Sequence, residues 1–401
     1  MTDFLKTIFF QNNNLENNIK CLKKETLIDK IFIISNYNNK HYNNLINVFN
    51  SLNINFETYF LDDYKNLNNS IEYLKNKIDF KTSLIFGLGD DTISYVTKKL
   101  SSYFETNYVL FLSNINSLQC FENFILEKAN NEIQVTTISP AMKIFIEEDD
   151  VTALNKTSIK SLLKDLISHL DCIINDYFLS SLQNIDLNLT KIEETLQAYK
   201  NIIKIKDKIF FGEAKAKLEF FDNLLDICDY FNKNNFNYIK SNNFNYSKSL
   251  YFLVNKNKNE NVNFYDICAT SNMFLFDMYK NFWSRKYNEN FDLPNLYKTS
   301  ELCKNYKLSL NLTEKDIFLS DKQLNFKLNS IRKDCLNFLN VIIDIHNEMY
   351  DLFKKFSSDG GYKLSKSISY DNLIEAFILT PYFCKEKNIL NLLYWIGALN
   401  F

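Results

Sequence analysis

The fold is decided by the stretch Leu84-Ile85-Phe86-Gly87-Leu88-Gly89-Asp90-Asp91-Thr92-Ile93-Ser94-Tyr95-Val96-Thr97-Lys98. A short apolar run ends in Gly-x-Gly, and a helical pattern follows at once. This order is typical of a phosphate-binding loop, in which backbone N–H groups at a helix N-terminus hold the anion. Two aspartates, however, stand where such a loop has small uncharged residues. The stretch therefore predicts the frame of a nucleotide site with altered chemistry.

The turn itself allows two interpretations. Gly87, Gly89 and Thr92 can cradle a phosphate, or they can simply form a tight connection between a strand and a helix. Asp90 and Asp91 oppose the first role, because one pair of like charges about 4 Å apart costs roughly 4 kcal/mol at an effective dielectric constant near 20. They favour the second, because an acidic N-cap stabilises a helix by roughly 0.5–2 kcal/mol. Carboxylates at this position would also fill the anion site with the chain's own charge.

Strand and helix patterns alternate through the first 150 residues. The predicted elements are Ile31–Ser35, Tyr42–Leu52, Phe56–Leu61, Ile71–Ile78, Ser83–Phe86, Thr92–Phe104 and Tyr108–Leu112. Continuous apolar strands separated by helices predict a parallel sheet that is covered on both faces. Ligands of such sheets bind beyond the carboxyl ends of the strands, where Gly87 lies.

The pattern becomes helical after residue 150. The long stretch Ser158–Leu182 carries one apolar stripe, and helical spacing continues to Phe401 with one exception at Leu250–Val254. The sequence therefore predicts an α/β domain over residues 1–150 and a helical domain over residues 151–401, with a cleft between them.

Composition excludes several classes of protein. The chain has 401 residues and a net charge of -2, so nothing attracts it globally to nucleic acid or to a membrane surface. Its eight cysteines are widely spaced, which indicates free thiols in a reducing compartment. No signal peptide or spanning segment is evident, so we expect a cytoplasmic protein. With only three histidines, a site built from several histidines is nearly excluded.

The order of these features resembles the dehydroquinate synthase-like superfamily, and most closely sn-glycerol-1-phosphate dehydrogenase and the iron-containing alcohol dehydrogenases. The matching turn residues are Gly87, Gly89, Thr92, Ile93 and Lys98. Pro140–Glu147 is similar to the family's proline-led strand, and Asp165, in Lys164–His169, matches its metal-binding aspartate. The resemblance implies a Rossmann-like sheet followed by an all-helical domain, and a nicotinamide-dependent oxidoreductase.

Departures from the family pattern concern its chemistry. Phe220 stands where the family has its first metal-binding histidine, and Lys258–Asn263 contains none where the second is expected. Tyr95 replaces an aspartate of the glycine loop. One aspartate cannot hold a catalytic metal, since such sites need three or more protein ligands. We therefore expect no tightly bound catalytic metal and no tightly bound cofactor, with NAD(P) as the cofactor if one is used.

Three residues remain candidates for chemistry. Asp165 and His169 share one helix face and can act as acid and base, or they can form a local hydrogen bond. Lys98 can meet a substrate phosphate, or it can be a solvated helix lysine.

Two functions compete, and a third possibility is altered chemistry that dispenses with the metal. One is a degenerate relative that binds a small phosphorylated polyol or sugar, a second copy of itself, or a partner enzyme. The other is an active NAD(P)-dependent oxidoreductase acting on such a phosphate.

Overall fold

The structure is a computed structural model that describes residues 7–10, 14–26, 28–61, 67–78, 84–129, 132–183, 189–233, 242–258, 264–284, 321–357 and 368–383. The chain forms two compact units. Unit 1 consists of Met1–Leu126, Val135–Leu162 and Lys204–Lys233, and unit 2 of Glu127–Gln134, Leu163–Ile203 and Asn234–Phe401. These units group residues that contact one another in space, whereas the predicted domains divide the chain at residue 150. That division therefore stays a prediction.

Unit 1 is built on a six-stranded sheet with the order β1-β8-β5-β4-β2-β3, in which every neighbouring pair is parallel. Its strands are β1 (Thr7–Phe10), β2 (Ile31–Asn36), β3 (Phe56–Leu61), β4 (Leu84–Gly89), β5 (Asn107–Leu112) and β8 (Lys143–Glu147). The parallel sheet predicted from the continuous apolar runs is confirmed.

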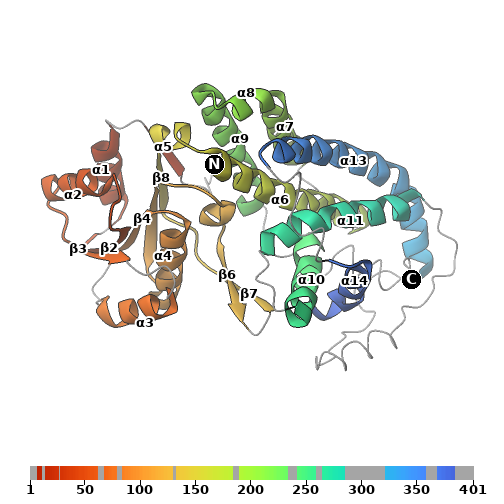
Figure 1. Ribbon diagram of the computed structural model, residues 1–401, viewed down its shortest axis with the longest axis horizontal. Helices are drawn as coiled ribbons and strands as arrows, with labels where there is room; N and C mark the ends of the chain where they lie inside the picture. The colour runs from red at the N-terminus through yellow and green to blue at the C-terminus, as the bar shows by residue number, and fades with distance from the viewer. Residues whose placement is uncertain are drawn as a thin grey trace. The chain divides into compact units, whose positions relative to one another are not determined.

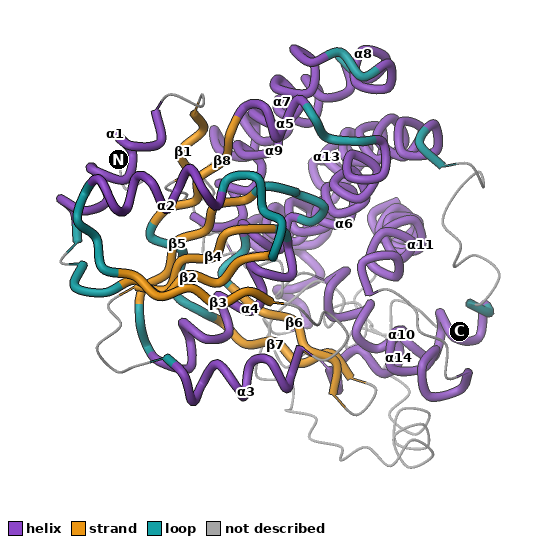
Figure 2. Tube along the Cα trace, turned by 60° about the vertical axis from the view of Figure 1, so that its left-hand side comes forward, coloured by secondary structure: helices purple, strands orange, loops and turns teal. Residues whose placement is uncertain are grey.

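Helices cover both faces of this sheet (Figures 1 and 2). One face packs against α1 (Leu15–Glu25) and α2 (Tyr42–Ser51), and the other against α3 (Leu67–Lys77) and α4 (Asp91–Phe104). The core of the first face includes Phe49, Phe86 and Phe111, all fully buried. Burial on both faces explains why β4 is apolar along its whole length rather than alternating.

The direction of winding reverses between β2 and β4. The chain runs outward from β2 to β3, and then in the opposite direction from β4 through β5 to β8. In open sheets of this kind, ligands bind beyond the carboxyl ends of the strands at the reversal. In unit 1 this place lies beyond Asn36 of β2 and Gly89 of β4.

Some elements have no counterpart in the predictions. β1 supplies an edge of the sheet, and β6 (Phe124–Ala129) and β7 (Glu132–Thr137) form a separate two-stranded sheet. The short helices η2 (Leu118–Phe121) and α5 (Glu148–Thr152) were not predicted either. Unit 1 also contains α8 (Lys206–Phe211), α9 (Ala214–Lys233) and the start of α6 (Lys156–Gln183), which lie in the stretch predicted to be helical.

In the part of unit 2 that the structure describes, helices predominate. They are α6 (Lys156–Gln183) from residue 163 onward, α7 (Leu189–Lys204), α10 (Asn242–Lys258), α11 (Phe264–Ser284), α13 (Asp321–Lys355) and α14 (Tyr370–Phe383). Leu250–Val254, the predicted exception, lies within α10, so that expectation is wrong. All five residues are buried, and a helix surrounded by protein shows the same continuous apolar run as a strand.

A buried carboxylate joins three helices of unit 2. Asp171 of α6 accepts a hydrogen bond from the backbone N–H of Asn243 in α10 at 2.7 Å. It also accepts one from the hydroxyl of Tyr279 in α11 at 2.9 Å. Among the described helices, none is both long and apolar enough to cross a membrane.

Candidate functional site

The two glycines of the β4–α4 turn are required by close packing. A Cβ atom on Gly87 would lie 2.3 Å from Thr97 Oγ1, and one on Gly89 would lie 2.0 Å from Asn36 Oδ1. Neither glycine has a positive φ angle, since Gly212 is the one described glycine that does. Strand β4 therefore needs glycine to approach α4 and β2, a reason that does not involve a ligand.

Asp90 is the N-cap of α4, as predicted. Its Oδ1 atom accepts hydrogen bonds from the N–H groups of Thr92 at 3.0 Å and Ile93 at 3.2 Å. Asp91, in the first helical turn, accepts a hydrogen bond from the N–H of Asn116 at 3.1 Å. The N–H groups that a phosphate would use are thus bonded to a carboxylate of the chain itself.

Lys98 is buried on α4, and the interpretation as a solvated helix lysine is wrong. Its ammonium donates to the main-chain carbonyls of Gln119 and of Glu122, the latter at 2.7 Å. Burial lowers the pKa of Lys98 to about 8, although Cys120, Glu122 and Asp91 oppose this shift. The pattern of α4 could not reveal the burial, because both acceptors lie more than twenty residues along the chain.

Asp165 and His169 are both buried on α6, in unit 2. The ring of His169 donates from Nδ1 to the main-chain carbonyl of Asp165 at 2.6 Å, and Ser168 Oγ donates to the same carbonyl at 2.7 Å. This contact fixes the orientation of the ring and places a proton on Nδ1. The predicted roles of the pair in catalysis stay predictions.

Phe220 of α9, which stands where the resemblance predicts a metal-binding histidine, has a fully buried ring. This side chain has no atom that can bind a metal. The second position, in Lys258–Asn263, lies outside the described residues from 259 onward.

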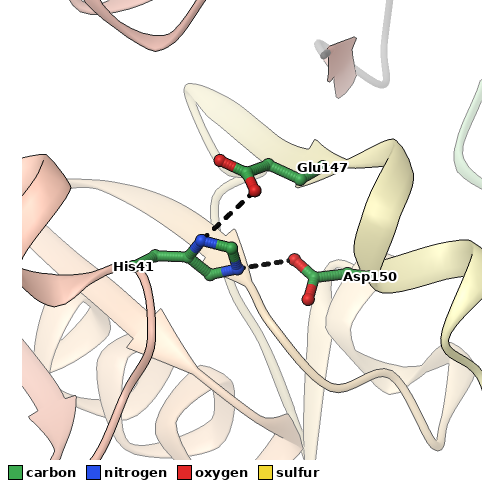
Figure 3. Close-up of side chains that lie close together, drawn as sticks. All are labelled: His41, Glu147 and Asp150. Carbon is green, nitrogen blue, oxygen red and sulfur yellow. Dashed lines mark hydrogen bonds and ion pairs between the residues drawn. The ribbon is translucent and has the colours of Figure 1, made fainter. Parts of the chain in front are cut away.

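A cluster of ionisable side chains that the sequence analysis did not single out lies at the carboxyl edge of the sheet in unit 1. We call Lys40, His41, Glu147 and Asp150 the His41 cluster. The ring of His41 lies between two carboxylates, with Nε2 2.7 Å from Asp150 Oδ2 and Nδ1 3.3 Å from Glu147 Oε2 (Figure 3). Lys40 Nζ lies 2.6 Å from Asp150 Oδ1. His41, Glu147 and Asp150 are all buried, and the ring stacks on Phe111 of β5 with centroids 4.7 Å apart.

A signal for this cluster was present in the sequence. His41 follows the apolar run that forms β2, and Glu147 ends the apolar run that forms β8. The carboxyl ends of parallel strands meet at one edge of a sheet, so polar residues that follow different strands are brought together there. The sequence alone does not show the order of the strands in the sheet, and this order decides which strand ends lie close together.

Asn39 connects the His41 cluster to the neighbouring strands. Its Oδ1 atom accepts a hydrogen bond from the N–H of His41 at 3.0 Å, and its Nδ2 group donates to Ser113 Oγ, just beyond β5, at 2.9 Å. Asn36 Nδ2 lies 3.5 Å from Asp90 Oδ2. The edge at which a ligand would bind is therefore lined by side chains that contact one another.

Comparison with known proteins identifies the fold. No protein-family model and no curated protein matches the chain, whereas many solved structures do. Maleylacetate reductase from Agrobacterium tumefaciens superposes with a TM-score of 0.54 at 8% identity, over 98% of this chain and 94% of that one. Glycerol dehydrogenase from Schizosaccharomyces pombe gives 0.51 at 10% identity, over 94% and 89%. An iron-containing alcohol dehydrogenase from Thermotoga maritima gives 0.51 at 10%, over 94% and 98%. The chain thus has the fold of these proteins, as the sequence analysis expected.

Proposed function

We propose that this chain is a divergent relative of the iron-containing alcohol dehydrogenases and glycerol-1-phosphate dehydrogenases that has lost metal-dependent hydride transfer. In this proposal it is retained to bind a small phosphorylated polyol or sugar, or a partner protein. The observation that carries the proposal is the bonding of the Asp90 carboxylate to the Thr92 and Ile93 N–H groups at the start of α4.

Asp90 opposes a nicotinamide cofactor in two ways. A pyrophosphate bound at this turn would have to replace the carboxylate at the two N–H groups. It would also lie beside the displaced negative charge, at a cost of roughly 4 kcal/mol for a unit pair about 4 Å apart. Both effects weaken binding of NAD(H) and NADP(H), so we expect neither to bind tightly.

The metal positions support the same proposal. In the enzymes that this chain resembles, hydride transfer needs a metal ion that polarises the hydroxyl group of the substrate. Asp165 matches one family ligand, but the buried ring of Phe220 stands at the position of another. Without that histidine, the family's metal site lacks one of the three or more ligands that such sites need.

The choice of a phosphorylated ligand rests on Lys98, the cation that this chain shares with the family's loop. An ammonium has three N–H groups, and the carbonyls of Gln119 and Glu122 accept two of them. With a pKa of about 8, Lys98 is mostly charged at neutral pH. A polyol or sugar phosphate is therefore a better candidate than a dinucleotide, since it needs only one anion site.

One observation favours the alternative, an active NAD(P)-dependent oxidoreductase of polyol or sugar phosphates. The ring of His169 is held in a fixed orientation by its hydrogen bond to the main-chain carbonyl of Asp165, and a fixed orientation suits a general acid or base. The two functions differ in whether turnover depends on this pair.

The test combines binding with turnover. Thermal-shift measurements with NAD(H), NADP(H), CTP, both glycerol phosphates and divalent metals should identify a ligand of the unmodified chain. Dehydrogenase assays with glycerol phosphate and either cofactor should give no activity above background. Turnover of about 1 per second or more that is lost in Asp165→Asn or His169→Ala would overturn the proposal in favour of the alternative. Asp344→Asn, at an exposed carboxylate of α13, is the matched control and should change nothing.

A further inference from the structure

The His41 cluster collects metal-binding atoms from two segments of unit 1, the start of α2 and the junction of β8 with α5. His41 precedes α2, Glu147 is the last residue of β8, and Asp150 belongs to α5. One nitrogen of His41 and one oxygen of each carboxylate all lie within 4.8 Å of one another. Figure 3 shows both carboxylates pointing toward the ring. The three side chains are therefore close enough for small rotations to bring them around one ion.

Acidic side chains outnumber the lysine at the His41 cluster. Glu147 and Asp150 are both buried, Glu148 and Asp149 lie between them in the chain, and Lys40 pairs with Asp150. A divalent cation would balance negative charge that Lys40 alone does not.

One buried carboxylate oxygen of the cluster accepts no hydrogen bond from the described residues. Glu147 Oε2 contacts His41, but Glu147 Oε1 is buried and has no hydrogen-bond partner among the described residues. A buried acceptor without a partner costs about 1–3 kcal/mol, and more when it is charged. A bound cation would satisfy this oxygen, which the contacts within the cluster do not.

We propose that His41, Glu147 and Asp150 form a binding site for a divalent transition-metal ion of the Zn²⁺ type. One imidazole nitrogen and two carboxylate oxygens belong to the usual ligands of Zn²⁺, whereas Mg²⁺ and Ca²⁺ prefer oxygen alone. This site lies in unit 1. It does not include Asp165, the residue that matches a metal ligand of the family that this chain resembles.

The contacts of His41 show where an ion would lie. Asp150 Oδ2 lies 2.7 Å from Nε2 and Glu147 Oε2 lies 3.3 Å from Nδ1, so each ring nitrogen faces a carboxylate. A metal ion binds one nitrogen of a neutral imidazole, and it would therefore lie between the ring and a carboxylate.

Binding would fix the loop between β2 and α2 to the end of β8. Three protein ligands leave at least one position of a tetrahedral ion open to water or to an anionic ligand. The proposed ion thus lies at the carboxyl edge of the sheet, in the same unit as the occupied anion site at Asp90.

Calorimetry on the full chain, after chelator treatment and with ZnCl₂ as the titrant, tests the proposal. We expect one ion per chain. His41→Gln, Glu147→Gln and Asp150→Asn should each weaken binding by more than the roughly 10–100-fold that loss of an indirect partner causes. Asp149→Asn is the matched control, since it removes the same charge from an exposed position of the same helix, and it should change affinity only slightly.

A second measurement keeps the test valid if the variants do not fold. The chain has only three histidines, so their ring signals can be followed one by one in the unmodified protein by NMR. Zn²⁺ should shift the signal of His41 and leave those of His169 and His346 in place. The absence of saturable Zn²⁺ binding would overturn the proposal. So would binding that Asp165→Asn abolishes and His41→Gln does not, because the ion would then lie on α6.

Discussion

Replacement of Asp90 separates its two effects on a bound anion. In Asp90→Gly the carboxylate is removed, and the N–H groups of Thr92 and Ile93 become available. In Asp90→Asn the charge is removed, but the amide oxygen can still accept from the same N–H groups, as Asp90 Oδ1 does at 3.0 and 3.2 Å. The φ angle of Asp90 is -93°, so neither replacement strains the backbone.

The magnitudes follow from charge and exposure. A unit pair of like charges about 4 Å apart costs roughly 4 kcal/mol at an effective dielectric constant near 20, which corresponds to about a thousandfold in affinity. Asp90 is only partly buried, so water screens its charge and the gain should be smaller, about 10–100-fold in Asp90→Gly. Asp90→Asn should gain less, because the N–H groups stay occupied. The helix itself should lose only a few tenths of a kcal/mol with glycine as its cap.

Calorimetry with NADH measures the affinities, and urea denaturation checks that each variant is folded. The expected order of affinity is Asp90→Gly above Asp90→Asn above the unmodified chain. Micromolar binding of NADH to the unmodified chain would refute the argument, because the carboxylate would then not exclude the cofactor. An Asp90→Gly protein that is folded but gains nothing would also refute it, since the turn would then lack the geometry of an anion site.

Three further predictions concern stability. Gly87→Ala should destabilise unit 1 by about 1–3 kcal/mol, because the new Cβ lies 2.3 Å from Thr97 Oγ1. Urea denaturation should show that adding Thr97→Ala recovers part of this stability. An equal loss of stability in the single and the double variant would contradict this cause. The free energy of unfolding should rise from pH 8 toward pH 10.5, relative to that of the Lys98→Met variant. The pKa of Lys98 is about 8 in the folded chain and 10.5 ordinarily, so the unfolded chain binds more protons in this range. Parallel pH profiles of the two proteins would argue against this cause. Tyr279→Phe should cost about 1–3 kcal/mol by removing a donor from the buried Asp171 carboxylate, and a loss well below that range in thermal unfolding would contradict the role of this contact.

The parallel sheet could be predicted because its signal is local. The central strands of the six-stranded sheet are short apolar runs, and Ser83–Phe86 and Tyr108–Leu112 predict β4 and β5 to within a few residues. The cap at Asp90 was predictable for the same reason, since its partners, Thr92 and Ile93, are two and three residues away. Local spacing is therefore enough wherever the stabilising contact is itself local.

Features that depend on distant contacts could not be predicted in this way. The sequence of α4 alone predicts that Lys98 is exposed. Its burial depends on Gln119 and Glu122, which the fold places beside it. The contact of His41 with Asp150 joins residues 109 positions apart. It requires the segment after β2 to reach past the ends of β4 and β5, which lie between β2 and β8 in the sheet. The burial of Leu250–Val254 within a helix likewise depends on the helices that surround it.

Polar groups at the carboxyl edge of the sheet are bonded within the chain itself. Parallel sheets bind ligands there because strand ends and helix N-termini leave polar backbone groups without partners. In this chain, Asp90 bonds the N–H groups of Thr92 and Ile93 in α4, and Asn39 bonds Ser113 beyond β5. If the proposed function is right, these contacts keep the edge stable when no cofactor is bound. Stability and activity are then separate properties of the chain, which is why binding has to be measured separately from turnover.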